Sequence, residues 1–430
     1  MIMIDETIYT VEVITMLLEF LCSNFKSIKE EIRFSMIAGS DKTNELYLKN
    51  IGNFRVLRSA IIYGPNGSGK SNFIQALSYM KDIVCNSIQY QPGQHIFQPY
   101  HKLSSIDTPS EFKIQFIKND IRYAYGFSIL KNKIIDEYLY FFPKGRQTKI
   151  FERVNLCVKP GDKYKNEFEL SESALKNNRL FLSCVANFSN NHEIENAFKF
   201  FMEDIVIYNP NVNNWTEYSI ELMQKNEKIK NIFVDILKSF DTGIKDVEVK
   251  LEKVSMNDLS NELFLPSSIK MLIKDQEANK IEAKVIYDDF TIDLMSEEST
   301  GIKKLFEIIC PMIDILNTGK ILVCDEIEAN LHESIVYNIV KIFHNYHKDK
   351  FAQLIFTTHD TSLLDSQLFR RDQIWFTQLT QSRSTDLYSL VEVKNVRKTE
   401  NLEKGYLLGK YGAIPLLNDK VINFIKQYEE

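Results

Sequence analysis

The sequence is poor in cysteine, and its cysteines are not arranged as metal or redox motifs require. There are six in 430 residues, and no two of them form a C-x-x-C pair. Zinc sites and disulfide frameworks need cysteines at short or matched spacings, so the sequence predicts neither. Free thiols are typical of proteins in a reducing compartment. The six are Cys22, Cys85, Cys157, Cys184, Cys310 and Cys324.

Long apolar runs and a leader are also missing. No stretch approaches the roughly 20 apolar residues that a transmembrane helix needs. The N-terminus lacks a basic segment followed by an apolar one, which is the pattern of a secretory signal. We therefore expect a cytoplasmic protein that has no membrane partner.

A surplus of basic residues is missing as well. Lysine and arginine number 52 against 58 acidic residues, which gives a net charge of −6. Without a global basic field the sequence does not favour wrapping by nucleic acid, and any such contact has to be local. The basic stretches at 144–149 and 159–165 are typical of solvated loops.

The chain does have enough apolar residues for a large core. A hydrophobic content of 44% over 430 residues indicates a soluble globular protein of two or three packed units. No internal repeat is visible.

The stretch GPNGSGKS, residues 64–71, is the motif with the most specific chemistry. It fits G-x-x-x-x-G-K-[ST], in which backbone N–H groups converge on phosphate oxygens. Lys70 would reach the β- and γ-phosphates, and Ser71 would offer its hydroxyl to Mg²⁺ at the start of a helix. The alternative is a glycine-rich turn without a ligand. The candidate phosphate-binding residues are Gly64, Pro65, Asn66, Gly67, Ser68, Gly69, Lys70, Ser71 and Asn72.

The segments on either side favour the phosphate-binding interpretation. Residues 57–63 form a short apolar run, as expected of a buried parallel strand. After the motif, apolar residues recur at helical spacing and make one stripe. These are Phe73, Ile74, Leu77, Met80, Ile83 and Val84.

The rest of the chain divides into three kinds of pattern. Residues 111–117, 121–129 and 134–142 alternate or run apolar, separated by polar turns, and predict an antiparallel meander with Phe112, Ile114 and Phe116 on one face. Residues 165–290 carry mixed helical patterns, such as 219–240, and Asn-rich breaks. Further on, 320–326 and 352–360 predict strands, and 301–316 and 334–343 predict helices. Pro311 should kink or split the first of these helices.

A second group of candidate residues lies where the later strands end. Asp325 and Glu326 follow an apolar strand, at the edge where open α/β sheets present ligand-binding groups. Asp325 is the candidate for the metal side and Glu326 for polarising water; the alternative is a solvated acidic turn. His359 follows the next strand and could reach the γ-phosphate at the same edge.

Other polar residues have weaker patterns. Ser299 and Gly301 precede a predicted helix and could present a hydroxyl and an N–H to an anion, although a plain N-cap explains them equally well. His344 and His347, three residues apart at a helix end, have no visible carboxylate or cysteine partner. We expect both to be solvated rather than metal ligands.

Taken together, the motifs resemble those of ABC-type ATPase heads of the SMC, RecF and OLD-like group. GPNGSGKS resembles Walker A, SEESTGIKKL the signature, ILVCDEIEANLH Walker B with the D-loop, and FTTHD the switch histidine. Several further stretches look like the AbiL/Rlo-type abortive-infection ATPases (AAA family) of prokaryotes. They include NFKSIKEEIRFSMIAG, TTHDTSLLD, RRDQIWF and GYLLGKYGAIP, and the resemblance spans roughly residues 16–420.

The resemblance implies a cofactor set and a shared site. In such heads two ATP molecules lie between two protomers, each site joining the Walker motifs of one chain to the signature of the other. Lys70 and Ser71 then bind phosphate and Mg²⁺, Asp325 supports the metal, Glu326 acts on the attacking water, and His359 senses the γ-phosphate. Ser299 and Gly301 act in trans.

The motifs depart from the family pattern at several positions. Glu298 occupies the usual leucine place of the signature, and Ile302 the usual Gln or Glu place. Residues 328–332, EANLH, replace the commoner D-loop sequence. For the metal-binding glutamine of the Q-loop, Gln98 and Gln94 are both candidates.

The resemblance also predicts the architecture. We expect an α/β, ABC-type P-loop ATPase head with a mixed or parallel nucleotide-binding sheet, an antiparallel β subdomain and an inserted, mainly helical region. The expected divisions are an N-terminal appendage at 1–15, lobe I at 16–164, the insertion at 165–290 and lobe II at 291–430.

Three functions remain open from the sequence. The first is an ATP-hydrolysing switch of antiphage defence that acts as a homodimer or higher assembly and controls a separate effector, a toxin or a nuclease. The second is a RecF- or SMC-like DNA-repair ATPase, against which the acidic balance and the lack of a long heptad insertion weigh. The third is a scaffold that holds ATP without turnover, against which Glu326 weighs.

Overall fold

The computed structural model describes residues 14–209, 214–255, 277–346, 350–397 and 400–415. The chain forms two compact units. Unit 1 comprises residues 1–209, 318–327 and 337–430, and unit 2 comprises 210–317 and 328–336. The bounds of the expected lobes and insertion come from motifs, whereas the bounds of the two units come from compactness. The units therefore do not test the lobes and the insertion, which stay predictions. The expected appendage lies almost wholly outside the described residues, and strand β1 (Thr15–Ser23) begins within one residue of the expected start.

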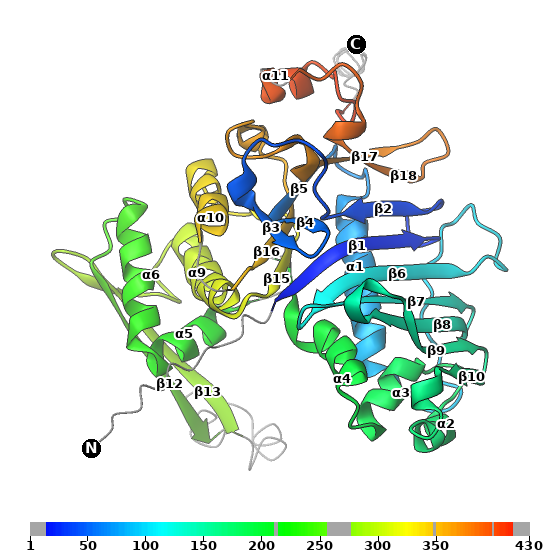
Figure 1. The fold of residues 1–430 in the computed structure, drawn as a ribbon. Coiled ribbons are helices and arrows are strands. Elements are labelled where there is room, and N and C mark those ends of the chain that lie inside the picture. Colours follow the sequence, from blue (N-terminus) through cyan, green and yellow to red (C-terminus); the bar gives the residue numbers. More distant parts are fainter. Residues whose placement is uncertain (1–13, 210–213, 256–276, 347–349, 398–399, 416–430) are drawn as a thin grey trace, which may run out of the picture. The chain divides into compact units, whose positions relative to one another are not determined.

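A six-stranded sheet in unit 1 carries the predicted parallel strands (Figure 1). Its order is β11-β15-β16-β5-β17-β18, and all neighbours are parallel except β17 and β18. Strands β5, β15 and β16 are entirely buried, as their apolar runs predict. The strands are β5 (Ser59–Tyr63), β11 (Ile205–Tyr208), β15 (Ile321–Cys324), β16 (Gln353–Thr357), β17 (Ile374–Leu379) and β18 (Thr385–Ser389).

A seven-stranded antiparallel sheet forms the other layer of unit 1. Its order is β10-β9-β8-β7-β6-β1-β2, and the predicted meander β6-β7-β8 is confirmed. Phe112, Ile114 and Phe116 of β6 are all buried. The strands besides β1 are β2 (Ile32–Ser35), β6 (Ser110–Lys118), β7 (Ile121–Leu130), β8 (Lys133–Phe142), β9 (Thr148–Val154) and β10 (Cys157–Pro160); β3 (Leu48–Ile51) and β4 (Phe54–Leu57) pair separately.

One apolar core joins these two sheets through helix α1 (Lys70–Asn86), whose predicted stripe is buried. Phe73 of α1 meets Phe20 of β1 and Phe34 of β2 at ring-centroid distances of 5.9 and 5.0 Å. Gln353 connects the sheets by polar contacts: its carboxamide accepts from Leu17 N–H at 2.7 Å and donates to Leu57 O at 3.0 Å. Unit 1 also holds α2 (Glu169–Ala174), α3 (Phe181–Phe188), α4 (His192–Lys199) and α11 (Leu402–Leu407).

Unit 2 has its own core between helices and a three-stranded sheet. Phe233 of α6 and Phe306 of α9 meet at 4.7 Å within it. The elements of unit 2 are α5 (Thr216–Lys225), α6 (Glu227–Ser239), α9 (Thr300–Thr318), β12 (Asp246–Ser255), β13 (Glu277–Ile286) and β14 (Thr291–Asp293). Helix α10 (Glu333–Asn345) begins in unit 2, and its residues from 337 on belong to unit 1. The α/β class with parallel and antiparallel sheets is thereby confirmed.

Of the two outcomes expected at Pro311, the split of the 301–316 helix is wrong and the kink stays a prediction. Helix α9 runs through Pro311 without interruption for 19 residues. Proline removes one backbone hydrogen bond, but the residues on both sides of it are buried. Met312 and Ile309 are 1% and 0% exposed, so their packing holds the helix together.

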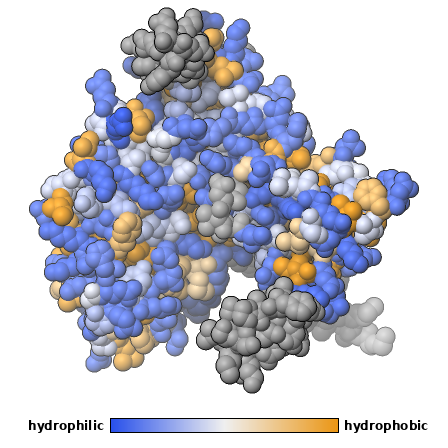
Figure 2. Space-filling view, turned by 180° about the vertical axis from the view of Figure 1, so that it is seen from behind, coloured by the Kyte–Doolittle hydropathy of each residue, from blue (hydrophilic) through white to orange (hydrophobic). Residues whose placement is uncertain are grey.

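Hydrophilic residues predominate on the face shown in Figure 2, and the apolar residues there lie in small separate groups. Within the part of the chain that the structure describes, no helix is long and apolar enough to cross a membrane.

A buried carboxylate ties β8 to helix α3. Glu137 accepts hydrogen bonds from the N–H groups of Phe181 and Leu182, at the first turn of α3, and from Tyr125 Oη at 3.0 Å. Arg153 of β9 completes the set at 3.1 Å, and neither charged side chain is exposed. Burial raises the pKa of Glu137, while Arg153 and the two N–H groups oppose that shift.

We expect Glu137→Ala to lower the free energy of unfolding by about 3–5 kcal/mol, because it leaves the Arg153 charge buried without its partner. Urea denaturation followed by circular dichroism measures the loss. The exposed Glu169→Ala is the control and should change stability by less than about 0.5 kcal/mol. A similar, small loss in both variants would contradict this role of Glu137.

The expectation of two solvated histidines is wrong for His344, and His347 lies outside the described residues. His344 is fully buried, stacks on Tyr47 at 4.1 Å and has Nε2 2.6 Å from Ser59 Oγ. Gln373 donates to Ser59 Oγ at 2.8 Å, so the Ser59 hydroxyl is available to donate to an unprotonated Nε2. Burial, with a smaller contribution from Arg58, lowers the pKa of His344 to about 3.

This pKa predicts an acid-sensitive fold. Between about pH 6.5 and 3 the unfolded state binds a proton at His344 that the folded state does not. The free energy of unfolding is therefore not reduced by His344 above pH 6.5, and it falls as the pH decreases below that value. The loss is at most about 1.4 kcal/mol per pH unit. Thermal unfolding from pH 7.5 to 4.5 should therefore show a shallower pH slope in His344→Gln than in wild type. Equal slopes would rule out this contribution.

Candidate functional site

The loop 64–69 joins β5 to α1 in a backbone shape that requires glycine. Gly67 and Gly69 have φ values of 78° and 108°, in the left-handed region, which side chains other than glycine seldom adopt. Gly69 is the N-cap of α1, and no side chain caps that end. The first N–H groups of the helix therefore remain available to a ligand.

One side of this loop is packed against hydroxyl groups of the hairpin β17–β18. A Cβ on Gly64 would lie 2.4 Å from Thr377 Oγ1, and a Cβ on Gly69 2.0 Å from Thr385 Oγ1. Thr377 donates to Tyr63 O at 3.3 Å, which leaves the Ser68 hydroxyl to donate to Thr377 Oγ1 at 2.6 Å. Only glycine allows the loop to approach the hairpin this closely.

Thr385 belongs to an ordered chain of hydrogen bonds that ends on the loop. Its hydroxyl donates to Ser68 O at 2.9 Å. Ser27 therefore donates to Thr385 Oγ1, and Asn72 Nδ2 donates to Ser27 Oγ, each at 2.6 Å. This series of hydrogen bonds runs from α1 through the 24–29 turn and β18 back to the glycine loop. It thereby fixes the position of the loop relative to α1 and β18.

The opposite side of the loop is open. Nothing lies within 4 Å of a Cβ placed on Gly67, and Asn66 and Gly67 are exposed. Lys70 is 5% exposed, and its ammonium donates to Gly64 O at 2.8 Å. A rigid glycine loop with open space on the N–H side and a lysine at its mouth is a cradle that fits phosphate groups.

Asp325 lies beside the start of α1, although 254 residues separate it from Ser71. Ser71 Oγ is 3.2 Å from Asp325 Oδ1. Thr357, at the end of β16, donates to the same oxygen at 2.7 Å. A serine hydroxyl with one carboxylate is a donor set that suits Mg²⁺, which usually takes its other ligands from water and phosphate. Among the described residues, no group of three or more histidine, cysteine, aspartate or glutamate side chains is placed to hold a metal ion.

Glu326 is held in an unusual backbone conformation. Its φ is 51°, which is uncommon for a residue other than glycine and clusters at functional sites. Thr357 Oγ1 accepts from Glu326 N–H at 2.8 Å and so fixes this turn. The Glu326 side chain is half-buried, next to Asp325.

His359 and Gln98 differ in their surroundings. Thr358 N–H donates to Ile62 O at 3.2 Å, so His359 follows β16 at the edge where β5 enters the glycine loop, and its side chain is exposed. The Gln98 carboxamide instead accepts from Lys131 N–H at 2.7 Å and donates to Ser110 Oγ at 3.1 Å. None of its described contacts is with Ser71 or Asp325.

Ser299 and Gly301 lie in unit 2, at the start of α9. The Ser299 hydroxyl accepts from Ile302 N–H at 3.3 Å. This is the contact of an N-cap, one of the two roles that the sequence analysis gave for Ser299. Both Ser299 and Thr300 are exposed. A Cβ on Gly301 would lie 3.4 Å from Asn330 O, within the segment 328–332.

Sequence reasoning missed the residues that hold the loop and the carboxylate in place. These are Ser27, Thr357, Thr377 and Thr385, and all act through hydroxyl groups: Ser27 in a turn, Thr357 and Thr385 at strand ends, and Thr377 within β17. The TT pair before His359 was a visible signal for Thr357. Single threonines in β17 and β18 give no signal, because their role comes from tertiary pairing.

A parallel α/β sheet with a glycine loop between a buried strand and a helix defines the class of P-loop proteins. The particular family is shown by comparison: residues 59–365, well over half of the chain, match the family described as "AAA domain, putative AbiEii toxin, Type IV TA system". The chain belongs to this AAA family, which confirms the family expected from its motifs. A comparison with curated proteins found no match.

Several solved structures of SMC heads are similar in fold. The SmcHead bound to the C-winged helix domain of ScpA is 15% identical, with a TM-score of 0.42 over 87% of this chain and 97% of that one. The SMC head domain from Thermotoga maritima is 13% identical, with a TM-score of 0.40 over 87% and 98%. A Smc head domain with an extended coiled coil, bound to the C-terminal domain of ScpA derived from Pyrococcus furiosus, is 15% identical, with a TM-score of 0.39 over 87% and 96%.

We expect Thr385→Val to weaken binding of ATP, the ligand expected from the motifs, while the chain remains folded. The change keeps the side-chain shape but leaves Ser68 O without its donor, which costs about 1–3 kcal/mol. Part of that cost falls on the loop, so the Kd for a fluorescent ATP analogue should rise roughly three- to thirtyfold. Thr385→Ser keeps the hydroxyl and should bind nearly as wild type. Equal affinity in the valine variant and wild type would show that the hydroxyl chain does not hold the loop for binding.

Proposed function

We propose that the chain binds ATP with Mg²⁺ and hydrolyses it. The observation that carries this proposal is the 3.2 Å contact between Ser71 Oγ and Asp325 Oδ1. It brings the two motifs that a triphosphate site needs to one place, at the mouth of the glycine loop. The membership of the chain in an AAA family supports the same conclusion.

In this proposal each residue of the site has a separate role in ATP binding or hydrolysis. The loop N–H groups and Lys70 bind the β- and γ-phosphates, and Ser71 and Asp325 hold the magnesium ion directly or through water. The ion, when bound, offsets negative charge on the phosphate oxygens. Thr357 keeps the Asp325 carboxylate pointed at Ser71. Glu326 orients the attacking water and accepts its proton, and His359 contacts the γ-phosphate from the end of β16.

The full site requires a second copy of the chain in this proposal. Ser299 and Gly301 present an exposed helix start that can accept an anion, and the resemblance to ABC-type heads assigns them to the ATP of the partner protomer. ATP then lies between two chains and holds them together, so hydrolysis opens the assembly. Glu298 and Ile302 make this trans contact differ in detail from the usual signature.

The biological role that fits best is a switch in antiphage or abortive-infection defence. The family description names a putative toxin of a type IV TA system, and the site described above has the parts of a nucleotide switch. A separate effector, a toxin or a nuclease, would then carry the harmful activity. Nuclease activity of the chain alone would contradict this division of labour.

Glu326→Gln and Lys70→Ala test the proposal. Glu326→Gln should lower phosphate release about 10²- to 10⁴-fold while ATP still binds, because only the group that acts on water is lost. In ATP and Mg²⁺ this variant should accumulate as a dimer or larger assembly by light scattering. Lys70→Ala should not retain ATP and should stay monomeric.

Glu169→Gln, an exposed change on α2, is the control and should hydrolyse ATP as wild type. Wild-type turnover in Glu326→Gln would remove Glu326 from the mechanism. If wild type and Glu326→Gln both stay monomeric in ATP, the shared site is wrong.

A further inference from the structure

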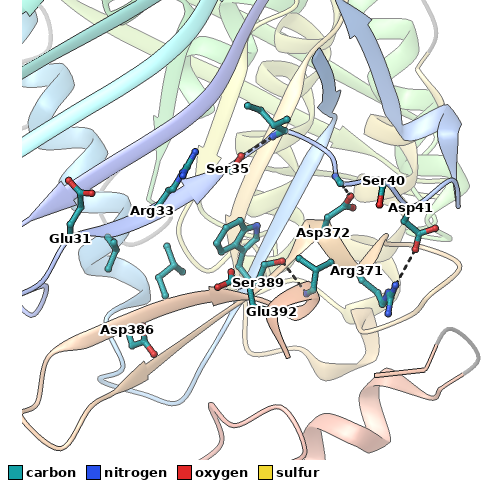
Figure 3. A pocket seen from close by; sticks show the side chains of 16 residues that line it. Glu31, Arg33, Ser35, Ser40, Asp41, Arg371, Asp372, Asp386, Ser389 and Glu392 are labelled. Atoms are coloured by element: carbon teal, nitrogen blue, oxygen red, sulfur yellow. Dashed lines mark hydrogen bonds and ion pairs between the residues drawn. The ribbon is translucent and has the colours of Figure 1, made fainter. Parts of the chain in front are cut away.

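Unit 1 contains a groove of about 660 Å³ outside the glycine loop (Figure 3). It is lined by β2 and the chain up to Asp41 on one side, and by the 3₁₀ turn 371–373, β18 and the 3₁₀ turn 390–392 on the other. Strand β2 ends the seven-stranded sheet and β18 ends the six-stranded sheet. The groove therefore lies where two sheet edges meet. In β18 the N–H groups of Thr385 and Ser389 already donate, to Ser27 O and to Glu392 Oε1, so an added strand would pair with the backbone between these two residues.

Most charged side chains in the groove are already neutralised. Asp41 pairs with Arg371 at 3.4 Å, and Asp372 pairs with Arg370 at 2.7 Å, as Figure 3 shows for the first pair. Two more pairs, Glu31 with Lys113 and Arg33 with Glu19, extend outside the groove.

Two carboxylates in the groove have no cation among the described residues. Asp386 accepts only from Gln378 Nε2 at 3.4 Å, and Glu392 only from Ser389 N–H at 2.8 Å. These two side chains leave the groove with negative charge that its own arginines do not offset. An occupant with positive charge would complement them.

Apolar surface accompanies these charges. Val391, in the same turn as Glu392, is 52% exposed, whereas Leu387 and Trp375, which also line the groove, are only 7% and 5% exposed. The Trp375 indole N–H has no acceptor among the described residues. Two sheet edges, apolar side chains and uncompensated carboxylates together suit an extended peptide better than a small polar molecule.

We propose that this groove docks an extended segment of a partner protein that carries lysine or arginine next to an apolar residue. The basic side chains pair with Asp386 and Glu392, and the apolar side chain packs on Val391 and Leu387. The segment runs along the β18 edge. The effector expected under the proposed function is a natural source of such a segment.

The position of the groove also links it to the nucleotide site, and this part rests on the proposed function. Asp386 directly follows Thr385, whose hydroxyl holds Ser68 O of the glycine loop. A segment that binds β18 acts on the strand that positions this hydroxyl. Docking and ATP binding should therefore influence each other's affinity by the same factor.

The test uses the full chain and two fluorescein-labelled octapeptides, one alternating lysine with valine and one alternating glutamate with valine. Wild type should bind the lysine peptide, more weakly at higher salt, and bind the glutamate peptide at least about tenfold less well. Asp386→Asn/Glu392→Gln should weaken binding of the lysine peptide roughly three- to tenfold, since each exposed pair contributes up to about 1 kcal/mol. The matched change Glu169→Gln/Glu172→Gln removes two exposed charges on α2 and should have no effect.

Thermal unfolding of the double variant, unchanged from wild type, shows that the loss is local. Equal binding of both peptides to wild type, or a lysine peptide that binds the double variant as tightly as wild type, would overturn the docking site. Lys70→Ala separates the two proposals, because it should abolish ATP retention and still bind the lysine peptide. If the lysine peptide leaves the affinity of wild type for ATP unchanged, the link through Thr385 is wrong while the docking result stands.

Discussion

The hydrogen bond between Ser71 and Asp325 is the contact on which the rest of the site depends. It closes the distance between the first turn of α1 and the end of β15, two segments 254 residues apart in the chain. Strand β16 lies between β15 and β5 in the sheet, and its Thr357 turns the carboxylate toward the serine. Sheet order, and not sequence proximity, thus brings Ser71 and Asp325 together.

The glycine loop depends on a second set of contacts, which come from behind it. The hairpin β17–β18 supplies two threonines, and the 24–29 turn supplies Ser27, which continues the chain to Asn72. All of these groups are short hydroxyl or amide side chains that are buried or half-buried. Their short reach permits little adjustment, so these contacts hold the loop in one conformation without a ligand.

Local pattern predicted much of the fold and part of the site. The apolar runs at β5, β15 and β16 and the stripe on α1 follow directly from burial, and the meander follows from its alternation. The sequence pattern did not predict that His344 is buried, because nothing near it in sequence shows that Tyr47 and Ser59 enclose it. The split expected at Pro311 is also wrong, because packing on both sides outweighs a local helix breaker. Thr357, Thr377 and Thr385 act only through pairing between distant strands, which a single sequence does not display.

The contact between Gly69 and Thr385 also sets an order of events during synthesis. During translation the glycine loop is synthesised early. Thr385, which packs against Gly69 of this loop, lies in β18, the last strand of its sheet to be synthesised. Until then the nascent protein has the motif without the support that shapes it. An interrupted translation product that stops before this strand would therefore carry the complete GPNGSGKS segment without the threonine that packs against it.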